Sequence, residues 1–169
     1  MNDVLKNIKV LAMDVDGVLT DGRIVVDSNG VESKFFDVQD GFGIVFAKQC
    51  SLKTVIISAR QSDVVKHRAD DLKIDKAFVG VYPKITAYEQ MIKEFGVSDA
   101  QVCFVGDDVA DLKIMKRCGF AVAVANAVFE VKQIAHHVTK NKGGRGAVRE
   151  VVELILKAQG RWTPELYGH

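Results

Sequence analysis

The chain has 169 residues, and its 23 Lys and Arg nearly balance 22 Asp and Glu, which leaves a formal net charge of +1. Nucleic-acid and membrane surfaces need a basic excess, so we expect neither partner. No apolar run approaches the roughly 20 residues that span a bilayer, and Met1–Asn7 lacks the apolar segment of a secretory signal. We therefore expect a cytoplasmic location. Three cysteines without CxxC spacing argue against a zinc or disulfide framework.

Apolar runs of strand length alternate with helical patterns along the chain. The runs are largely continuous, as in strands that are covered on both faces of a parallel sheet. They are Ile8–Val15, Thr54–Ser58, Ala77–Val81, Gln101–Val105 and Phe120–Val124. Helices are expected over Phe42–Gln49, Asp63–Leu72, Ile85–Phe95, Asp108–Lys116, Val128–Ala135 and Ala147–Ala158. The alternation predicts a single α/β domain over residues 1–169, a doubly wound, Rossmann-like three-layer sandwich with a parallel central sheet.

One segment interrupts the alternation directly after the first strand. Arg23–Asp27 and Val31–Val38 flank Ser28-Asn29-Gly30, and an Asn-Gly pair tolerates the positive φ of a hairpin turn. We expect a small β-hairpin flap over about residues 23–38, near the carboxyl edge of the sheet. At the other end of the chain, residues 161–169 are expected to form a tail beyond the last helix.

Two carboxylates, Asp14 and Asp16, follow the first strand and precede Gly17. In open parallel sheets, ligands bind beyond the carboxyl ends of the strands. Two like charges this close are costly unless a cation lies between them. Asp and Gly are also common turn residues, so the bland alternative is an ordinary acidic loop. The position directly after an apolar strand favours a catalytic, metal-binding pair.

A second acidic segment, Gly106-Asp107-Asp108-Val109-Ala110-Asp111, follows a later strand. Asp107 is expected to complete a magnesium site with Asp14, because Mg²⁺ prefers carboxylate oxygens, water and phosphate as ligands. Asp108 and Asp111 also suit the first turn of the next helix, where negative charge is favoured. Helix capping is an equal alternative for Asp108, whereas for Asp111 a supporting role beside the ligands is favoured over capping.

Polar residues follow two further strands at the same edge. The hydroxyl of Ser58 can bind a phosphate oxygen without adding charge, and Ser62 is the better placed cap for the next helix. Arg60 is either a surface charge or a fork-shaped donor for a carboxylate or phosphate. A lone Lys is usually a solvated surface charge, but Lys84 precedes a helix at the edge that carries the acids. There it would hold a phosphate and offset the carboxylates.

These segments, in this order, resemble the four motifs of the haloacid dehalogenase-like phosphohydrolase superfamily. The finer resemblance is to the 3-deoxy-D-manno-octulosonate 8-phosphate phosphatases, its small members with only a hairpin cap. It spans roughly residues 7–160 and is carried by Asp14–Gly22, Asp40–Ile44, Gly143–Glu150 and Ala158–Gly160. There are two departures. Gln39 stands where the family has Arg, which bears on contacts near the substrate or a subunit interface, and Ala59 stands where it usually has Gly, which bears on loop shape.

The resemblance implies a magnesium-dependent phosphomonoesterase that forms an aspartyl-phosphate on Asp14. Magnesium would be held by Asp14, the backbone carbonyl of Asp16, and Asp107. Asp16 would protonate the departing sugar oxygen and later activate the water that cleaves the intermediate. The implied substrate is 3-deoxy-D-manno-octulosonate 8-phosphate, a precursor in lipopolysaccharide synthesis.

The same resemblance assigns supporting roles. Ser58 and Lys84 would hold the phosphoryl group, and Asp111 would position either Lys84 or a water on the metal. Arg60 and Arg68 would meet the carboxylate of the sugar acid, although Arg68 is equally well explained as a surface charge. The resemblance also implies a homotetramer in which the hairpin of a neighbour covers each active site.

Three alternatives to this function remain at the level of sequence. A related phosphatase would act on a nine-carbon sugar-acid phosphate, or the chain would be a related domain detached from a nucleotide-sugar synthase. A non-catalytic oligomerising module of the same fold would have lost one of the key acids or Lys84, and all are present. A phospho-accepting receiver domain would carry its acceptor Asp after the third strand rather than the first.

Overall fold

Six parallel strands form the central sheet in the order β5-β4-β1-β6-β7-β8 in the computed structural model, which describes residues 2–163 and 165. The strands are β1 (Val10–Met13), β4 (Lys53–Ser58), β5 (Lys76–Val79), β6 (Val102–Gly106), β7 (Phe120–Ala123) and β8 (His137–Val138). The chain runs outward from β1 through β4 and β5, then crosses to β6 on the other side of β1. The carboxyl end of β1 is therefore the point where the strand order reverses, which is where such folds bind ligands.

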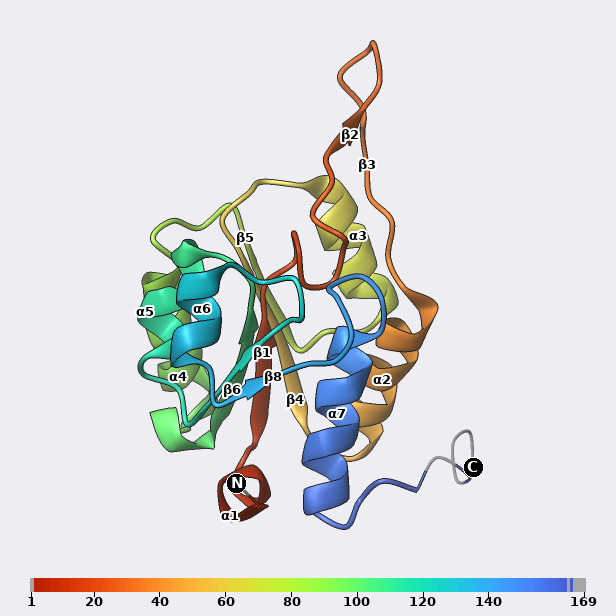
Figure 1. Cartoon of the computed structure of the whole chain (residues 1–169). Coiled ribbons are helices and arrows are strands. Elements are labelled where there is room, and N and C mark those ends of the chain that lie inside the picture. The colour runs from red at the N-terminus through yellow and green to blue at the C-terminus, as the bar shows by residue number, and fades with distance from the viewer. Residues whose placement is uncertain (1, 164, 166–169) are drawn as a thin grey trace.

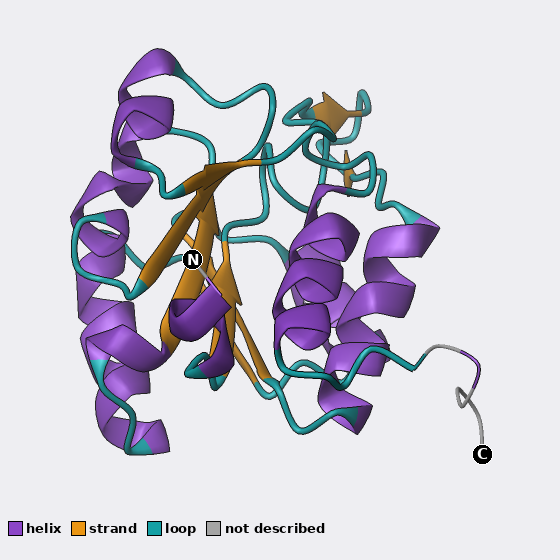
Figure 2. Cartoon of the chain, turned by 60° about the horizontal axis from the view of Figure 1, so that its bottom comes forward, coloured by secondary structure: helices purple, strands orange, loops and turns teal. Residues whose placement is uncertain are grey.

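Helices cover both faces of the sheet (Figure 1; Figure 2). One layer contains α2 (Val38–Gln49), α3 (Asp63–Asp71) and α7 (Ala147–Ala158), and the other contains α4 (Lys84–Phe95), α5 (Leu112–Met115) and α6 (Phe129–Ile134). The short α1 (Asn2–Lys6) lies at the amino ends of the strands, and two 3₁₀ turns, η1 (Asp99–Gln101) and η2 (Val109–Asp111), flank β6. This arrangement confirms the predicted three-layer α/β fold with a parallel sheet.

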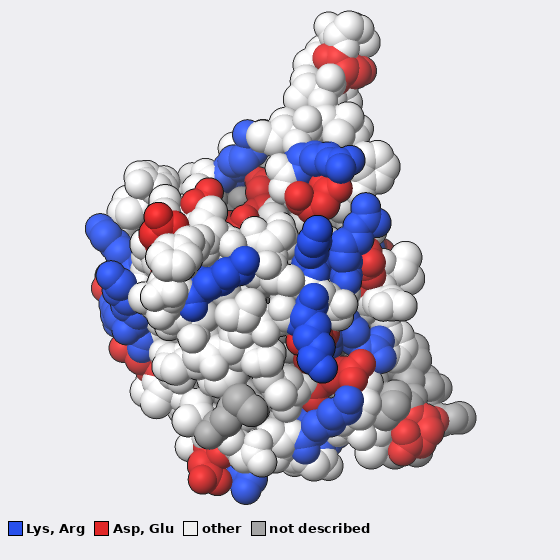
Figure 3. Space-filling view, in the orientation of Figure 1, with Lys and Arg blue, Asp and Glu red and all other residues white. Residues whose placement is uncertain are grey.

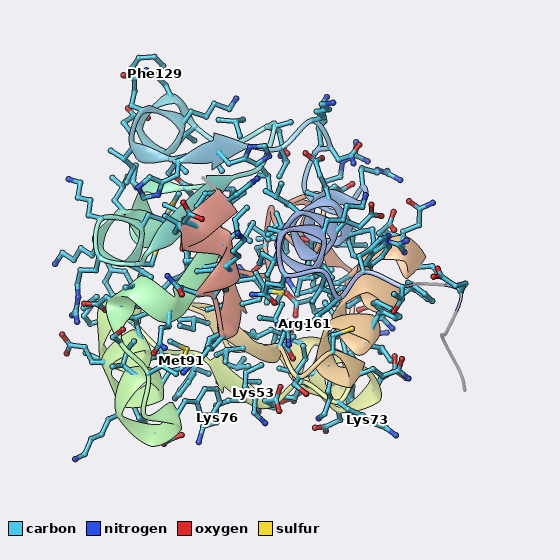
Figure 4. All side chains as sticks on the ribbon, turned by 90° about the horizontal axis from the view of Figure 1, so that it is seen from below. Lys53, Lys73, Lys76, Met91, Phe129 and Arg161 are labelled. Atoms are coloured by element: carbon cyan, nitrogen blue, oxygen red, sulfur yellow. The ribbon has the colours of Figure 1, made fainter. Side chains whose placement is uncertain are left out.

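The core lies where the two helical layers meet the sheet. All residues of β1, β6 and β7 are buried, as the continuous apolar runs predict for strands that are covered on both faces. Tyr88 and Phe104 are among the largest fully buried side chains. The opposite end of the sheet, where Lys53 and Lys76 begin β4 and β5, faces the viewer in Figure 4. The carboxyl ends of the strands lie at the other end of the sheet, beyond this core.

The predicted hairpin is present, and it projects away from the sheet (Figure 1). Its paired strands, β2 (Val25–Val26) and β3 (Glu32–Ser33), are shorter than the expected segments. At its turn, Asp27 Oδ1 accepts hydrogen bonds from the backbone N–H groups of Asn29 and Val31 at 2.9 and 2.8 Å. Large apolar side chains are exposed along or beside the hairpin: Ile24, Val25, Val26, Val31, Phe35 and Val38.

Three elements were not predicted from the sequence: α1, η1 and β8. The helix expected over Asp108–Lys116 is divided into η2 and α5. Within the expected tail, Trp162 packs edge-on against Phe46 with ring centroids 5.1 Å apart, whereas residues 164 and 166–169 lie outside the described part. Across the described residues, the helices are too short or too polar to span a membrane.

Candidate active site

Asp14 is the first residue after β1, and it is buried. Its backbone N–H donates to the carbonyl of Val105 at 3.1 Å, which ties it to the end of β6. Its Oδ1 accepts from the N–H of Val15 at 2.7 Å, and its Oδ2 lies 2.6 Å from Nζ of Lys84. Because Lys84 is the first residue of α4, two distant segments fix one carboxylate at the edge of the sheet.

Asp111, the last residue of η2, binds the same Lys84. Its side chain is fully buried, and its Oδ1 accepts from Nζ of Lys84 at 2.8 Å. Its Oδ2 accepts from the N–H groups of Asp107 and Asp108 at 3.0 and 3.4 Å, which shapes the loop after β6. Asp111 therefore positions both Lys84 and Asp107.

Three carboxylates converge at this point. One oxygen each of Asp14, Asp107 and Asp111 lies within 4.8 Å of the others. Oδ1 of Asp107 is buried and has no hydrogen-bond partner among the described residues. A buried carboxylate oxygen without a donor is costly, and a bound cation would satisfy it. These oxygen donors therefore fit a hard divalent cation such as Mg²⁺.

Burial and mutual repulsion raise the pKa values of carboxylates in the acidic cluster. Burial raises the pKa of Asp14 to about 7, with repulsion from Asp111 adding to the rise and attraction to Lys84 opposing it. Burial also raises the pKa of Asp107 to about 7, and repulsion from Asp14 contributes. Burial alone would lower the pKa of Lys84, but the attraction of Asp14 and Asp111 outweighs it, so the pKa is raised. Lys84 therefore stays charged, and one ammonium does not offset all the neighbouring carboxylates.

A pocket of about 170 Å³ opens above the cluster and collects most of the residues predicted for the site. Ser58, the last residue of β4, is buried and lies in this lining. The full lining consists of Asp14, Asp16, Ser58, Ala59, Arg60, Lys84, Asp107, Asp108 and Ala110. Asp108 also caps η2, because its Oδ1 accepts from the N–H of Val109 at 2.7 Å. Its two proposed roles are thus compatible.

Asp16 lies under the base of the hairpin, where two cations hold its carboxylate. Nζ of Lys34 is 2.5 Å from Oδ1 of Asp16, and Nε of Arg60 is 3.5 Å from Oδ2. Glu32 joins the same network, since its Oε1 lies 2.9 Å from Nη2 of Arg60 and 3.2 Å from Nζ of Lys34. Its Oε2 accepts from Oγ of Ser62 at 2.5 Å. Near the base of the hairpin, acidic and basic groups lie side by side on the surface in the space-filling view (Figure 3).

Glu32 and Lys34 were not singled out in the sequence. Their spacing of two residues puts both side chains on one face of the predicted strand Val31–Val38. This alternation was the sequence signal from which a shared contact of the two residues could have been predicted. The side chain of Lys34 is wholly buried. The sequence did not reveal, however, which face of the hairpin turns toward Asp16.

Arg68 lies apart from the acidic pocket. It stands on α3, where its Nη1 pairs with Oδ2 of Asp71 at 2.5 Å and its guanidinium lies 5.5 Å from the ring centroid of Phe36. Gln39, one of the two departures from the family pattern, lines a separate pocket of about 410 Å³ together with Asp21, Phe35 and Arg145, among others. Arg68 and Gln39 are therefore both outside the lining of the acidic pocket.

Comparison with known proteins agrees with this fold. A model of the haloacid dehalogenase-like hydrolases matches residues 80–151. The 3-deoxy-D-manno-octulosonate 8-phosphate phosphatase of Haemophilus influenzae is 41% identical over 161 residues, which are 95% of this chain and 89% of that protein. The Escherichia coli K12 enzyme is 40% identical over 156 residues, covering 92% and 83%.

Solved structures of the same family are also similar to this chain. The phosphatase of this type from Moraxella catarrhalis, in complex with magnesium, phosphate and a KDO molecule, has a TM-score of 0.93 and 41% identity, covering 95% of this chain and 92% of that one. The cobalt-bound H. influenzae structure has a TM-score of 0.90 and 41% identity, covering 93% and 92%. The fold and the acidic edge thus define a haloacid dehalogenase-like hydrolase. Within that class, the chain belongs to the 3-deoxy-D-manno-octulosonate 8-phosphate phosphatase family, which confirms the resemblance found in the sequence.

Proposed function

We propose that this protein is a magnesium-dependent phosphatase that hydrolyses 3-deoxy-D-manno-octulosonate 8-phosphate to the free sugar acid and phosphate. The observation that carries the proposal is the contact of 2.6 Å between Asp14 and Lys84, beside Ser58 and Asp107 in one pocket. It supports the proposal because the proposed nucleophile, the proposed phosphate-binding cation and a proposed metal ligand share one pocket at the edge of the sheet. The protein names of the relatives supply the substrate.

Asp14 is the proposed nucleophile. A carboxylate oxygen attacks phosphorus and forms the aspartyl-phosphate while the bond from phosphorus to the sugar oxygen breaks. Lys84 and the N–H of Val15 hold the carboxylate in place. The ammonium of Lys84 also attracts the phosphoryl oxygens, and the hydroxyl of Ser58 donates to one of them.

Asp16 is the proposed proton carrier. It gives a proton to the departing sugar oxygen, and it then takes a proton from the water that attacks the aspartyl-phosphate, which regenerates Asp14 and releases phosphate. Lys34 and Arg60 orient its carboxylate at the mouth of the pocket. The two aspartates thus have separate tasks, although they are only two residues apart.

The side chains of Asp14 and Asp107 and the backbone carbonyl of Asp16 would hold magnesium. The unpaired Oδ1 of Asp107 and the convergence of carboxylate oxygens support this assignment. When bound, the ion offsets the repulsion between the ionised nucleophile and the phosphate dianion. Asp111 acts behind these ligands, because it binds Lys84 and the backbone of the Asp107 loop.

Arg60 is the proposed contact for the carboxylate of the sugar acid. It lines the pocket, and about half of its side chain is exposed, although Glu32 engages one of its nitrogens. For Arg68, the pairing with Asp71 and the place outside the pocket lining favour the alternative of a structural surface charge. Substrate recognition would therefore depend on the loop after β4 and the base of the hairpin.

The proposal includes an assembly, a location and a cellular role. We propose a cytoplasmic homotetramer in which the hairpin of Arg23–Val38 from a neighbouring subunit covers each active site. The exposed apolar side chains along the hairpin support a protein contact there. The reaction would serve the synthesis of a lipopolysaccharide precursor.

The test is a phosphate-release screen over a panel of sugar phosphates, with and without magnesium. The panel contains the eight-carbon sugar-acid phosphate, its nine-carbon counterparts and simple hexose phosphates. We expect magnesium-dependent release that is strongest with the eight-carbon compound. Preference for a nine-carbon compound would transfer the assignment to that substrate, and no release from any compound would indicate a non-catalytic module.

A further inference from the structure

A buried carboxylate lies outside the reaction assigned to Asp14 and Asp16. Asp40 is in the first turn of α2, and only 1% of its surface is exposed. Its Oδ1 accepts from the N–H of Arg149 at 2.8 Å, and its Oδ2 accepts from the N–H of Gly146 at 3.2 Å. These donors belong to the start of α7, which lies beside α2 (Figure 1). Asp40 therefore caps a helix to which it does not belong.

The free N–H groups at the start of a helix are usually capped by a side chain from the same segment. A Ser, Asp or Asn at the N-cap position accepts from the first free N–H groups of its own helix. The N-cap of α7 is Gly146, which has a φ of 86° and no side chain to offer. Because the cap is supplied from α2 instead, the start of α7 is held at a fixed place relative to a second helix. The dipole of α7 also favours the ionised form of Asp40 and partly offsets the cost of burying its charge.

The loop that leads into α7 contacts the backbone of residues 17–21, which follow Asp16. The N–H of Gly144 donates to the carbonyl of Val18 at 2.9 Å. A Cβ atom at Gly143 would overlap the carbonyl oxygen of Gly17, and one at Gly144 would lie 2.5 Å from the backbone nitrogen of Asp21. Both positions therefore require glycine for a close backbone approach. The segment contacted, residues 17–21, begins one residue after Asp16.

We propose that Asp40 is a positioning residue for the phosphatase reaction. Its carboxylate fixes the start of α7, and residues 143–146 transmit that position to residues 17–21. The backbone that carries Asp14 and Asp16 is thereby held in the geometry that the metal and the substrate require. The inference rests on the proposed function for its kinetic consequences, but its effect on magnesium affinity is independent of turnover.

The test compares Asp40→Ala and Asp40→Asn with Asp75→Asn in the full-length protein. Ala removes both acceptors, whereas Asn retains one acceptor and turns an amide donor toward the second N–H. Asp75 is a matched control, because its Oδ2 accepts from the N–H of Thr54 at 2.9 Å and its Oδ1 pairs with Lys53 at the start of β4, the opposite end of the sheet. Unfolding temperature, kcat, KM and calorimetric magnesium affinity are measured for each variant, well below its unfolding temperature.

We expect Asp40→Ala to lower kcat by about tenfold to a hundredfold, because small displacements of reacting groups have effects of this size. Magnesium affinity should fall as well, with a smaller loss in both quantities for Asp40→Asn. Asp75→Asn should lower the unfolding temperature without changing either. A variant on the other side of the contact, Gly143→Ala, should reproduce the loss of kcat and of magnesium affinity while Asp40 is intact.

The outcomes separate the two proposals. If both Asp40 variants lose only thermal stability, like Asp75→Asn, then Asp40 is merely structural and the inference is overturned. It is also overturned if Gly143→Ala alone shows the kinetic loss, since the glycine loop would then be positioned without Asp40. If the wild-type protein releases no phosphate, the proposed function fails, whereas the magnesium titrations still decide the role of Asp40.

Discussion

Nζ of Lys34 lies 2.5 Å from Oδ1 of Asp16, and the Lys34 side chain is completely buried in this contact. The hairpin that projects from the sheet is thus anchored to the loop of its own chain that carries Asp16. Glu32 completes the anchor by pairing with Lys34 and Arg60. The base of the hairpin therefore contacts the candidate site through Asp16 and Arg60.

Replacing Lys34 by methionine tests this anchor. Methionine retains most of the length of the side chain but removes the ammonium, so Asp16 loses its closest charged partner. We expect kcat to fall by about tenfold, because a general acid and base must be held at its proton-transfer distance. Lys66→Met, which breaks the exposed pair of Lys66 with Asp63, is the control and should be neutral. Equal kcat values for the two variants would show that Lys34 does not orient Asp16.

Asp14→Asn should abolish phosphate release, since an amide is not a nucleophile toward phosphorus. We expect a loss of at least about a thousandfold in kcat, the scale seen when a nucleophile is removed. The fold should remain intact, because Asn can still accept from the N–H of Val15. Circular dichroism and a phosphate-release assay check the two statements. Measurable turnover by the folded variant would refute the role of Asp14.

Asp16→Asn should slow both chemical steps and leave Asp14 able to attack. The amide cannot protonate the departing sugar oxygen, and it cannot take a proton from the water in the second step. With an activated substrate that has a good leaving group, the first step should proceed and the phospho-enzyme should accumulate. Mass spectrometry of the acid-quenched protein detects the added phosphoryl group. Rapid, complete turnover of the sugar phosphate would exclude the acid–base role.

The sequence predicted the fold because its signals were local and strong. Continuous apolar runs such as Gln101–Val105 specify buried parallel strands, and the structure has β6 at Val102–Gly106. The missed elements α1 and β8 are only five and two residues long, too short to show a period. The split of Asp108–Lys116 into η2 and α5 depends on how Asp111 bonds back to the loop.

The candidate site was predictable to the extent that it lies at strand ends. Asp14, Ser58 and Asp107 each lie at the carboxyl end of a strand, and a parallel sheet brings these ends together. The contacts of Lys34 and Asp40 were not predicted, because their partners are distant in the chain. Lys34 pairs across 18 residues and Asp40 across 106 and 109, and no local pattern specifies such contacts.

Magnesium binding should release protons near neutral pH. Burial raises the pKa values of Asp14 and Asp107 to about 7 in the metal-free protein, so both are partly protonated there. A bound cation favours their ionised forms, and magnesium affinity should therefore decrease as the pH falls below about 7. Calorimetric titrations in two buffers of different ionisation enthalpy measure the protons released. Asp107→Asn should reduce both the affinity and the release; an identical heat of binding in the two buffers would contradict the expectation.

The pH dependence of unfolding should identify Asp40 as a buried titrating group. Burial raises its pKa from 3.8 to about 6, although the N–H groups of Arg149 and Gly146 oppose the rise. The folded state therefore binds a proton more tightly than the unfolded state, so this contribution to stability is complete below about pH 4 and is lost as the pH rises through about 6. The free energy of unfolding of the wild type, minus that of Asp40→Asn, should be about 1 kcal/mol larger at pH 5 than at pH 7.5. Urea denaturation at the two pH values measures this difference. The change cannot come from Asp14 or Asp107, which both proteins retain, and a difference that stays constant with pH would place the pKa of Asp40 near its ordinary value.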